Sequence, residues 1–272
     1  MSITLSAIEE TLYIPLWCRA QASIKYQSLF YDSKAVELVQ AIGYDFSLID
    51  ARLSPVIRLA SIARARQCDA VLKVYIADHP RASVVDLGAG LDTAFYRIDN
   101  GLIDWYNLDL PRVIAIRKQL LPETDRVHCI AKSFLDMSWC DDLINIDDGV
   151  FVVAGAVLGY FSEVELKTFF SSLADRLPGV EMVFTAYSSG ELSLINRSLQ
   201  RVGMASAAMK WALEDASVLT RWDDRISVVD EFSFFRDIPY DQAWGEETID
   251  KIRSIDEHKR MRIVHLRFNA RE

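Results

Sequence analysis

Apolar and polar positions divide the chain into three regions. From Ala7 to about Ala77 apolar residues recur at helical spacing, which predicts three or four helices and no clear strand. From Ser83 to Ser188 short apolar runs alternate with helical stretches, which predicts a parallel sheet with crossover helices. After Gly190 come two helical stretches and two runs typical of strands, Arg225–Phe235 and Arg260–Phe268. We expect these two runs to pair antiparallel at one edge of the sheet.

Individual elements follow from the same pattern. Between the strands we expect a short helix near Asp92–Arg97, a helix that begins at Pro111, and a helix that begins after Ser162. Ser162 and Glu165 have the spacing of a capping box. The expected strands of the parallel part are Ser83–Leu87, Asp104–Leu108, Val127–Ala131, Val150–Ala154 and Val180–Tyr187.

The first expected strand leads into a turn with two glycines. The sequence SVVDLGAGLDT, residues 83–93, contains Gly88, Ala89 and Gly90, whose small side chains let the backbone pass close to a ligand. A dinucleotide-binding turn has a third glycine where this chain has Thr93. The negative charge of Asp86 suits a cationic ligand, so S-adenosylmethionine is favoured over NAD. An ordinary strand-to-helix turn without a ligand is the remaining alternative.

Two later loops offer groups that suit an adenosine. Asp109 and Leu110 follow the second strand, and an acid about twenty residues beyond the glycine turn can accept hydrogen bonds from ribose hydroxyls. NAD enzymes use the same device, and Asp109 can instead cap the helix that begins at Pro111. Ser133, Phe134 and Asp136 follow the third strand, where an adenine ring would lie. For Phe134, packing into the core is the favoured interpretation.

Composition limits the partners. The 30 basic and 39 acidic residues give a net charge of −9, which opposes binding to nucleic acid. The four cysteines are scattered and form no metal motif, which favours reduced thiols in the cytoplasm and no metal site. The longest apolar stretch, Val150–Phe161, is too short to cross a bilayer, and no signal peptide is visible. With 272 residues, we expect one domain in which a helical cap region, 1–80, precedes the core, 81–272.

Four segments together resemble a known family. VVDLGAGLDTAFYRID, WYNLDLP, SFLDMSW and VFVVAGAVLGYF are similar to the leucine carboxyl methyltransferase family, and more closely to its bacterial branch of tetracenomycin-type polyketide carboxyl O-methyltransferases. The resemblance implies an α/β fold of class I S-adenosylmethionine-dependent methyltransferases: a Rossmann-like, mostly parallel seven-stranded sheet with an antiparallel edge and an N-terminal helical cap. It also implies O-methylation of a small-molecule carboxylate, such as that of a polyketide-like metabolite.

The resemblance assigns site residues as well. Arg64 looks like the arginine that holds the carboxylate of S-adenosylmethionine, with Arg66 as the competing assignment. After the fourth strand the family usually has Ala-Glu-Gly, whereas this chain has Ala154-Gly155-Ala156 and lacks the glutamate. The expected cofactor-binding residues are Arg64, Asp86, Gly88, Ala89, Gly90, Asp109, Leu110, Ser133, Phe134, Asp136, Ala154 and Gly155.

The expected acceptor follows from the chemistry that the loops lack. None of the four histidines lies on a predicted ligand loop, and a carboxylate, unlike a phenol, needs no base to become nucleophilic. Tyr160 is placed to orient the acceptor, or it belongs to the edge of the core. Arg19 and Tyr26 in the N-terminal helices are expected to cover the pocket and bind an acidic substrate. The alternatives are a cofactor-binding regulatory protein and an NAD-dependent oxidoreductase; a homodimer is a further expectation.

Overall fold

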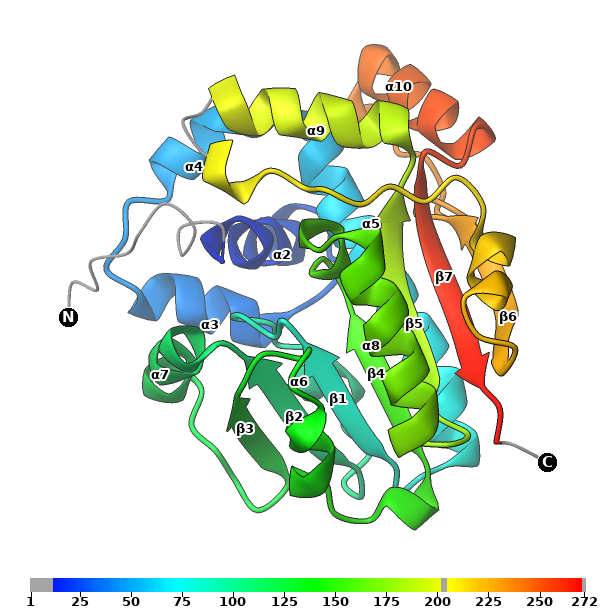
Figure 1. The fold of residues 1–272 in the computed structure, drawn as a ribbon. Helices are drawn as coiled ribbons and strands as arrows, with labels where there is room; N and C mark the ends of the chain where they lie inside the picture. The colour runs from blue at the N-terminus through cyan, green and yellow to red at the C-terminus, as the bar shows by residue number, and fades with distance from the viewer. Residues whose placement is uncertain (1–11, 202–204, 271–272) are drawn as a thin grey trace.

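The computed structural model describes residues 12–201 and 205–270, so the expected helical positions from Ala7 to Thr11 lie outside the described residues. Seven strands form one mixed sheet in the order β3-β2-β1-β4-β5-β7-β6 (Figure 1). The strands are β1 (Ser83–Leu87), β2 (Asp104–Asp109), β3 (Val127–Ala131), β4 (Val150–Ala154), β5 (Glu181–Tyr187), β6 (Ile226–Ser233) and β7 (Met261–Phe268). The predicted α/β fold class is therefore confirmed.

Strand directions place the ligand edge. β1 pairs in parallel with β2 and β4, and β2–β3 and β4–β5 are parallel as well. β7 is antiparallel to both β5 and β6, which confirms the predicted antiparallel edge and places the last strand between the other two. The chain moves outward from β1 to β3 and then returns to β4, so the strand order reverses between β1 and β4. Ligands of open α/β sheets bind at such a reversal, beyond the carboxyl ends of the strands.

Helices cover both faces of the sheet and its ligand edge. In Figure 1, α8 lies in front of the sheet and α5 behind it, while α2, α3, α4 and α9 gather beyond the carboxyl ends of the strands. The helices are α2 (Tyr13–Lys25), α3 (Ser33–Ala41), α4 (Ser47–Arg52), α5 (Pro55–Asp78), α6 (Phe95–Ile98), α7 (Pro111–Leu120), α8 (Glu163–Arg176), α9 (Ser189–Arg201) and α10 (Glu246–Glu257). Within the expected cap region, α5 thus packs along the sheet.

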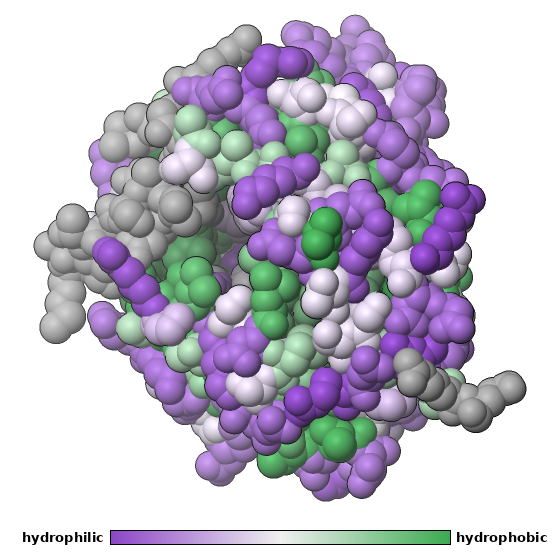
Figure 2. Space-filling model, in the orientation of Figure 1, coloured by the Kyte–Doolittle hydropathy of each residue, from purple (hydrophilic) through white to green (hydrophobic). Residues whose placement is uncertain are grey.

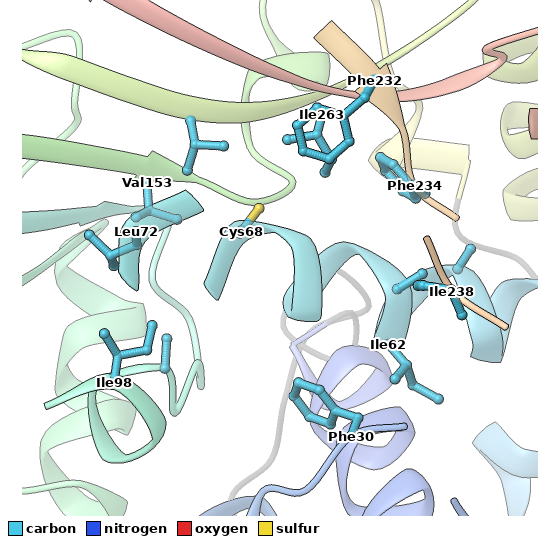
Figure 3. Close-up of a cluster of buried hydrophobic side chains, with 14 of the residues drawn as sticks. Phe30, Ile62, Cys68, Leu72, Ile98, Val153, Phe232, Phe234, Ile238 and Ile263 are labelled. Atoms are coloured by element: carbon cyan, nitrogen blue, oxygen red, sulfur yellow. The ribbon is translucent and has the colours of Figure 1, made fainter. Parts of the chain in front are cut away.

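Two hydrophobic clusters fill the two faces of the sheet because neighbouring strand residues point to opposite sides. Val84 belongs to the cluster under α5 and α10, and Val85 belongs to the cluster under α8. In Figure 3, Leu72 and Cys68 of α5 lie near Val153 of β4, while other side chains of the same cluster surround the rest of the helix. α5 is therefore buried on several sides, unlike a surface helix with a single apolar stripe.

A third cluster joins the cap to the sheet. Tyr13 and Leu16 of α2 and Leu38 of α3 pack with Leu91 of the glycine turn and with Leu121, which follows α7. The cap helices are therefore held against the turn itself. On the face in Figure 2, apolar side chains occur as small separate groups among hydrophilic ones. Within the described part of the chain, every helix is too short or too polar to cross a membrane.

Candidate cofactor and acceptor site

The glycine turn adopts a backbone that requires glycine. Gly88 has φ +66° and Gly90 has φ +46°, a region that side chains with a Cβ rarely adopt. A Cβ on Gly88 would lie 2.8 Å from Val157, and a Cβ on Gly90 would lie 2.9 Å from Leu12. Ala89 between them is buried. The turn is therefore a close crossing point of the sheet, the β4 loop and the first cap helix.

Asp86 lies at the carboxyl end of β1, just before this turn. Its side chain is buried, and among the described residues its Oδ2 atom has no hydrogen-bond partner. Burial raises the pKa of Asp86 well above its ordinary value, and the nearby carboxylate of Asp92 raises it further. An ammonium group would satisfy this orphaned acceptor and stabilise its charge, whereas a phosphate would repel it. The residues here fit the cationic end of S-adenosylmethionine.

Asp109 closes the turn from the next strand. Its Oδ2 accepts a hydrogen bond from the Gly90 backbone N–H at 2.8 Å, and its Oδ1 accepts one from the Leu110 N–H at 2.7 Å. The residue at the cap position of α7 is Leu110, so Asp109 does not take the alternative role of helix cap. Each carboxylate oxygen keeps a free lone pair for a ribose hydroxyl. The exposed side chain of Leu110 lies beside it at the ligand edge.

The three expected ligand residues of the loop after β3 lie in different environments. Phe134 is buried and packs edge-on against Phe161 and Phe169, as the core interpretation predicted. Its side chain is therefore committed to the core. Ser133 accepts a hydrogen bond from the backbone of Leu135, and Asp136 accepts one from the Ser138 N–H at 3.1 Å. Asp136 is exposed, so its carboxylate is the accessible polar group of this loop.

Arg19 binds the glycine turn, and it does not take the acceptor-binding role that was expected for it. Its guanidinium donates to Asp32 at 3.2 Å and to the backbone oxygen of Leu91 at 2.9 Å, and its side chain is only 3% exposed. The physical reason is that a buried guanidinium must be paired, and both partners lie where α2 meets the turn. Tyr26, at the end of α2, packs on the cluster of α5. Neither residue lines the acceptor cavity described below.

Sequence reasoning missed the rest of this buried network. Arg97 donates to Asp32 at 2.6 Å and to Asp69 at 2.7 Å, and the Thr93 hydroxyl donates to the same Asp32 oxygen at 2.6 Å. Asp92 accepts from two backbone N–H groups at the start of α6. The Gly-Leu-Asp-Thr segment therefore fastens the cap to the sheet. The signal in the sequence was that segment itself. Asp32, however, lies 61 positions before Thr93 and 65 positions before Arg97, so local pattern could not indicate the pairing.

Arg117 is a second missed residue. It is 2% exposed, and its guanidinium donates to the backbone oxygen of Gly90 at 2.9 Å from α7. Arg117 thus binds the backbone oxygen of Gly90, while Asp109 binds the backbone N–H of the same residue. Nothing in the local sequence of α7 distinguishes Arg117 from a solvated lysine or arginine near a helix end.

Arg64 and Arg66 point to different places. Arg66 donates to the backbone oxygen of Leu29 at 2.8 Å and lines a surface hollow that also contains Lys73 and Arg97. Arg64 lines the large cavity between the cap and the sheet, and its guanidinium makes no ion pair or hydrogen bond within the described chain. Arg64 is therefore the arginine whose charge is available to a ligand.

The large cavity has a volume of about 750 Å³ and is mostly apolar. This is the size of a pocket for a drug-sized molecule. Its walls come from α2, α4, α5, α9, α10 and the start of β7. The apolar lining includes Ile14, Ile49, Val56, Ile57, Ala60, Leu194, Ile195, Leu199, Met209, Phe234 and Met261. Most of the α9 and α10 wall lies after Gly190, where sequence reasoning named no site residue; the apolar residues spaced along α9 were the available signal.

The loop after β4 adjoins this cavity. Tyr187 of β5 lines the cavity, and burial and the neighbouring Tyr187 raise the pKa of Tyr160, which the Arg64 charge opposes. Tyr160 is half-buried and does not itself belong to the cavity lining. Gly155 has open space where a Cβ would lie, and its backbone oxygen accepts from the Thr185 hydroxyl at 2.8 Å. Ala154 is buried in the strand.

The fold and the polar groups at its ligand edge define the class. A sheet with this order and an antiparallel β7, a glycine turn after an acidic strand end, and a second acid at Asp109 are the features of an S-adenosylmethionine-dependent methyltransferase. The sequence model of the leucine carboxyl methyltransferase family matches residues 14–172. The chain belongs to this family, and S-adenosylmethionine is its cofactor. A nicotinamide-dependent oxidoreductase is thereby excluded.

Known proteins extend the comparison. The chain is 29% identical over 213 residues to the tetracenomycin polyketide synthesis O-methyltransferase TcmP of Streptomyces glaucescens, covering 78% of this chain and 77% of that protein. It is 26% identical over 212 residues to the S-adenosyl-L-methionine-dependent methyltransferase dpfgK of Gibberella zeae, covering 71% of each. A solved structure from Thermobifida fusca, proposed to be a methyltransferase, has a TM-score of 0.60 at 14% identity, covering 93% of this chain and 94% of that one. At that identity the structural likeness shows the shared fold.

Proposed function

We propose that the protein methylates the carboxylate of an apolar, polyketide-like small molecule that lies in the cavity between the cap and the sheet. The observation that carries this proposal is the cavity itself, about 750 Å³ of mostly apolar space that reaches Tyr187 at the carboxyl end of β5. The likeness to a polyketide synthesis O-methyltransferase supports the same substrate class.

Each end of the cofactor has a group of matching chemistry in this chain. Asp86 would pair with the ammonium, Arg64 with the carboxylate, and Asp109 with the ribose hydroxyls. Gly88 and Gly90 let the backbone approach the bound molecule. Leu110, Ser133 and Asp136, with the backbone at Phe134 and at Ala154-Gly155, would border the adenosine. S-adenosylmethionine supplies an electrophilic methyl group when it is bound.

The cavity suits an acceptor that arrives already ionised. An acceptor carboxylate oxygen forms the new bond to the methyl carbon while the carbon–sulfur bond breaks, and that electron pair stays on sulfur, so no proton has to move. The described lining contains no histidine. Apolar walls strip water from the carboxylate and hold it in place, which are the main contributions that such a displacement needs. Tyr160 would orient the acceptor from the loop after β4, because its hydroxyl is influenced by Tyr187 and Arg64 of the cavity wall.

The linkage of the product distinguishes carboxylate from phenol methylation. The protein is incubated with radiolabelled S-adenosylmethionine and 2-naphthoic acid or 6-hydroxy-2-naphthoic acid, and the label in the organic product is measured before and after mild alkali. A methyl ester releases its label as methanol, whereas a methyl ether retains it. We expect alkali-labile product. Alkali-stable product, or none from any acid at millimolar concentration, contradicts the proposal; 2-naphthol serves as the matched control acceptor.

A further inference from the structure

Glu191 is a buried acid whose side chain makes no hydrogen bond within the described chain. It stands in the first turn of α9, is 7% exposed, and lines the acceptor cavity. The backbone N–H of Glu191 donates to the Ser188 hydroxyl at 3.3 Å, and that of Ser189 donates to Glu214 at 2.7 Å, so the start of the helix is capped without the Glu191 side chain. Within residues 12–201 and 205–270, the Glu191 Oε2 atom has no hydrogen-bond partner. A carboxylate left in this state at a cavity wall points to a ligand.

Arg260 faces Glu191 from the residue before β7. One terminal nitrogen of its guanidinium lies 3.6 Å from the Glu191 Oε2 atom, beyond hydrogen-bond distance but close enough for an ion pair. The Nε–H of Arg260 is buried and likewise has no partner in the described chain. Arg260 also lines the cavity. One wall of a mostly apolar space therefore carries an unsatisfied acceptor and an unsatisfied donor.

The chemistry of this pair selects the group that would bind there. Leaving a buried donor or acceptor unpaired costs about 1–3 kcal/mol, so a ligand that satisfies both gains affinity. Because Arg260 already balances the charge of Glu191, an added ammonium or carboxylate would leave a net charge in the apolar wall. An apolar group would leave both atoms unpaired. A hydroxyl is neutral and can donate to a carboxylate and accept from a guanidinium.

We infer that Glu191 and Arg260 form a specificity-determining subsite for a hydroxyl group on the acceptor, remote from the carboxylate that is methylated. The acceptor class is then a hydroxylated aromatic acid. This inference rests on the proposed function for the carboxylate end of the acceptor, whereas the subsite itself rests on the geometry of the Glu191 and Arg260 side chains.

The other acid on the cavity provides a matched control. Glu247 of α10 also belongs to the cavity lining, but it is exposed and accepts from Lys251 one turn later at 2.6 Å. Its charge is therefore already paired in solvent. Replacing Glu247 by Gln changes the net charge of the cavity as Glu191→Gln does, without touching the buried subsite.

Binding of three acids tests the subsite. Calorimetry in the presence of S-adenosylhomocysteine compares 2-naphthoic acid, 6-hydroxy-2-naphthoic acid and 6-methoxy-2-naphthoic acid. We expect the native protein to bind the hydroxy acid about tenfold more tightly than the other two, the gain of one satisfied buried pair. Glu191→Leu should abolish this preference and leave the affinity for 2-naphthoic acid nearly unchanged. Glu191→Gln should retain part of the preference.

The outcomes separate the subsite from the reaction. Absence of a hydroxyl preference in the native protein, including failure of every acid to bind, overturns the subsite. The same preference in Glu191→Leu and native protein, or its equal loss in Glu247→Gln, also overturns it. Melting temperatures with S-adenosylhomocysteine show whether each variant is folded, and Glu191→Gln provides an isosteric variant should Glu191→Leu unfold. A hydroxyl preference without alkali-labile product would support the subsite and contradict carboxylate methylation.

Discussion

The cofactor side and the acceptor side of this protein are built in opposite ways. On the proposed cofactor side, groups near the carboxyl ends of β1 and β2 bind one another: Asp109 of β2 accepts from the Gly90 N–H, and Arg117 of α7 donates to the Gly90 oxygen. On the acceptor side, segments from Ile14 to Met261 meet around an apolar cavity. Each side keeps buried polar atoms that have no hydrogen-bond partner in the described chain: Asp86 Oδ2 and Arg117 Nε on the first, and Glu191 Oε2 and Arg260 Nε on the second. The two hydrogen bonds to Gly90 join residues 19 and 27 positions apart, whereas the cavity depends on the packing of helices that are far apart in the sequence.

Two helix starts with the same local sequence pattern sharpen this contrast. At α8, Glu165 accepts from the Ser162 N–H at 2.7 Å and completes the predicted capping box. At α9, Ser188 and Glu191 have the same spacing, but the Ser188 N–H donates to the backbone oxygen of Arg260 at 2.9 Å. The backbone oxygen of Arg260, one residue before β7, therefore accepts the hydrogen bond that the Glu191 side chain would otherwise accept. A carboxylate freed in this way is available to a ligand.

The largest effect is expected from adding one methyl group to the glycine turn. Gly88→Ala forces a left-handed backbone on a residue with a Cβ and brings that Cβ within 2.8 Å of Val157. We expect affinity for S-adenosylhomocysteine to fall about 100-fold, measured by calorimetry. Gly101→Ala is the control, because Gly101 also has a positive φ, +84°, but precedes β2 and is away from the carboxyl ends of the strands. Similar losses in both variants would contradict the glycine turn as the cofactor site.

Removing the charge of Asp86 is expected to weaken binding and stabilise the fold. Asp86→Asn should lower affinity for S-adenosylhomocysteine by at least about tenfold, because the ammonium loses its charged partner. Since burial raises the pKa of Asp86, the folded protein holds this proton more tightly than the unfolded chain, and stability falls as pH rises above the ordinary aspartate value.

The Asp86→Asn variant does not lose stability in this way as the pH rises. Its melting temperature should exceed that of the native protein by roughly 2–4 °C at pH 8 and by less at pH 4. Circular dichroism melts in the two buffers measure the difference. A native protein that is more stable than Asp86→Asn at pH 8 would show that the carboxylate has a partner in the folded state.

The two arginines of α5 differ in their expected effect on the cofactor. Arg64→Gln should weaken binding of S-adenosylhomocysteine about tenfold or more, since it removes a charge-assisted hydrogen bond. Arg66→Gln should change it less than about twofold, because Arg66 donates to Leu29 on the other side of the cap. Calorimetry on both variants decides between them. The reverse order would assign the cofactor carboxylate to Arg66.

The smallest effect concerns the two helix starts. Glu165→Gln should lower the free energy of unfolding by a small amount, because glutamine can still accept from the Ser162 N–H but without the charge of the carboxylate. Glu191→Gln should change that free energy by less, because the Glu191 carboxylate caps nothing and its ion pair with Arg260 is long. Urea unfolding of both variants measures this. A greater loss in Glu191→Gln would assign Glu191 a structural role.

Strands and ligand loops could be predicted because their signals are local. The ranges of β1, β3 and β4 match the prediction residue for residue, since short apolar runs bounded by polar loops read directly as buried strands. The capping box of α8 is confirmed for the same reason. Phe134 also lies in the core as expected. Local pattern could not indicate that Arg19 would pair with Asp32 and Leu91, because that choice depends on how α2 packs on the turn.

The sequence by itself determined the sheet, the glycine turn and the acids at the carboxyl ends of β1 and β2, because each depends on residues a few positions apart. Tertiary structure decided which charges remain available. It buried Arg19, Arg97 and Arg117 in the support of the turn, where a guanidinium without partners would be too costly, and it left Arg64 on the cavity. It also brought Glu191 to face Arg260, 69 positions later, across an apolar space.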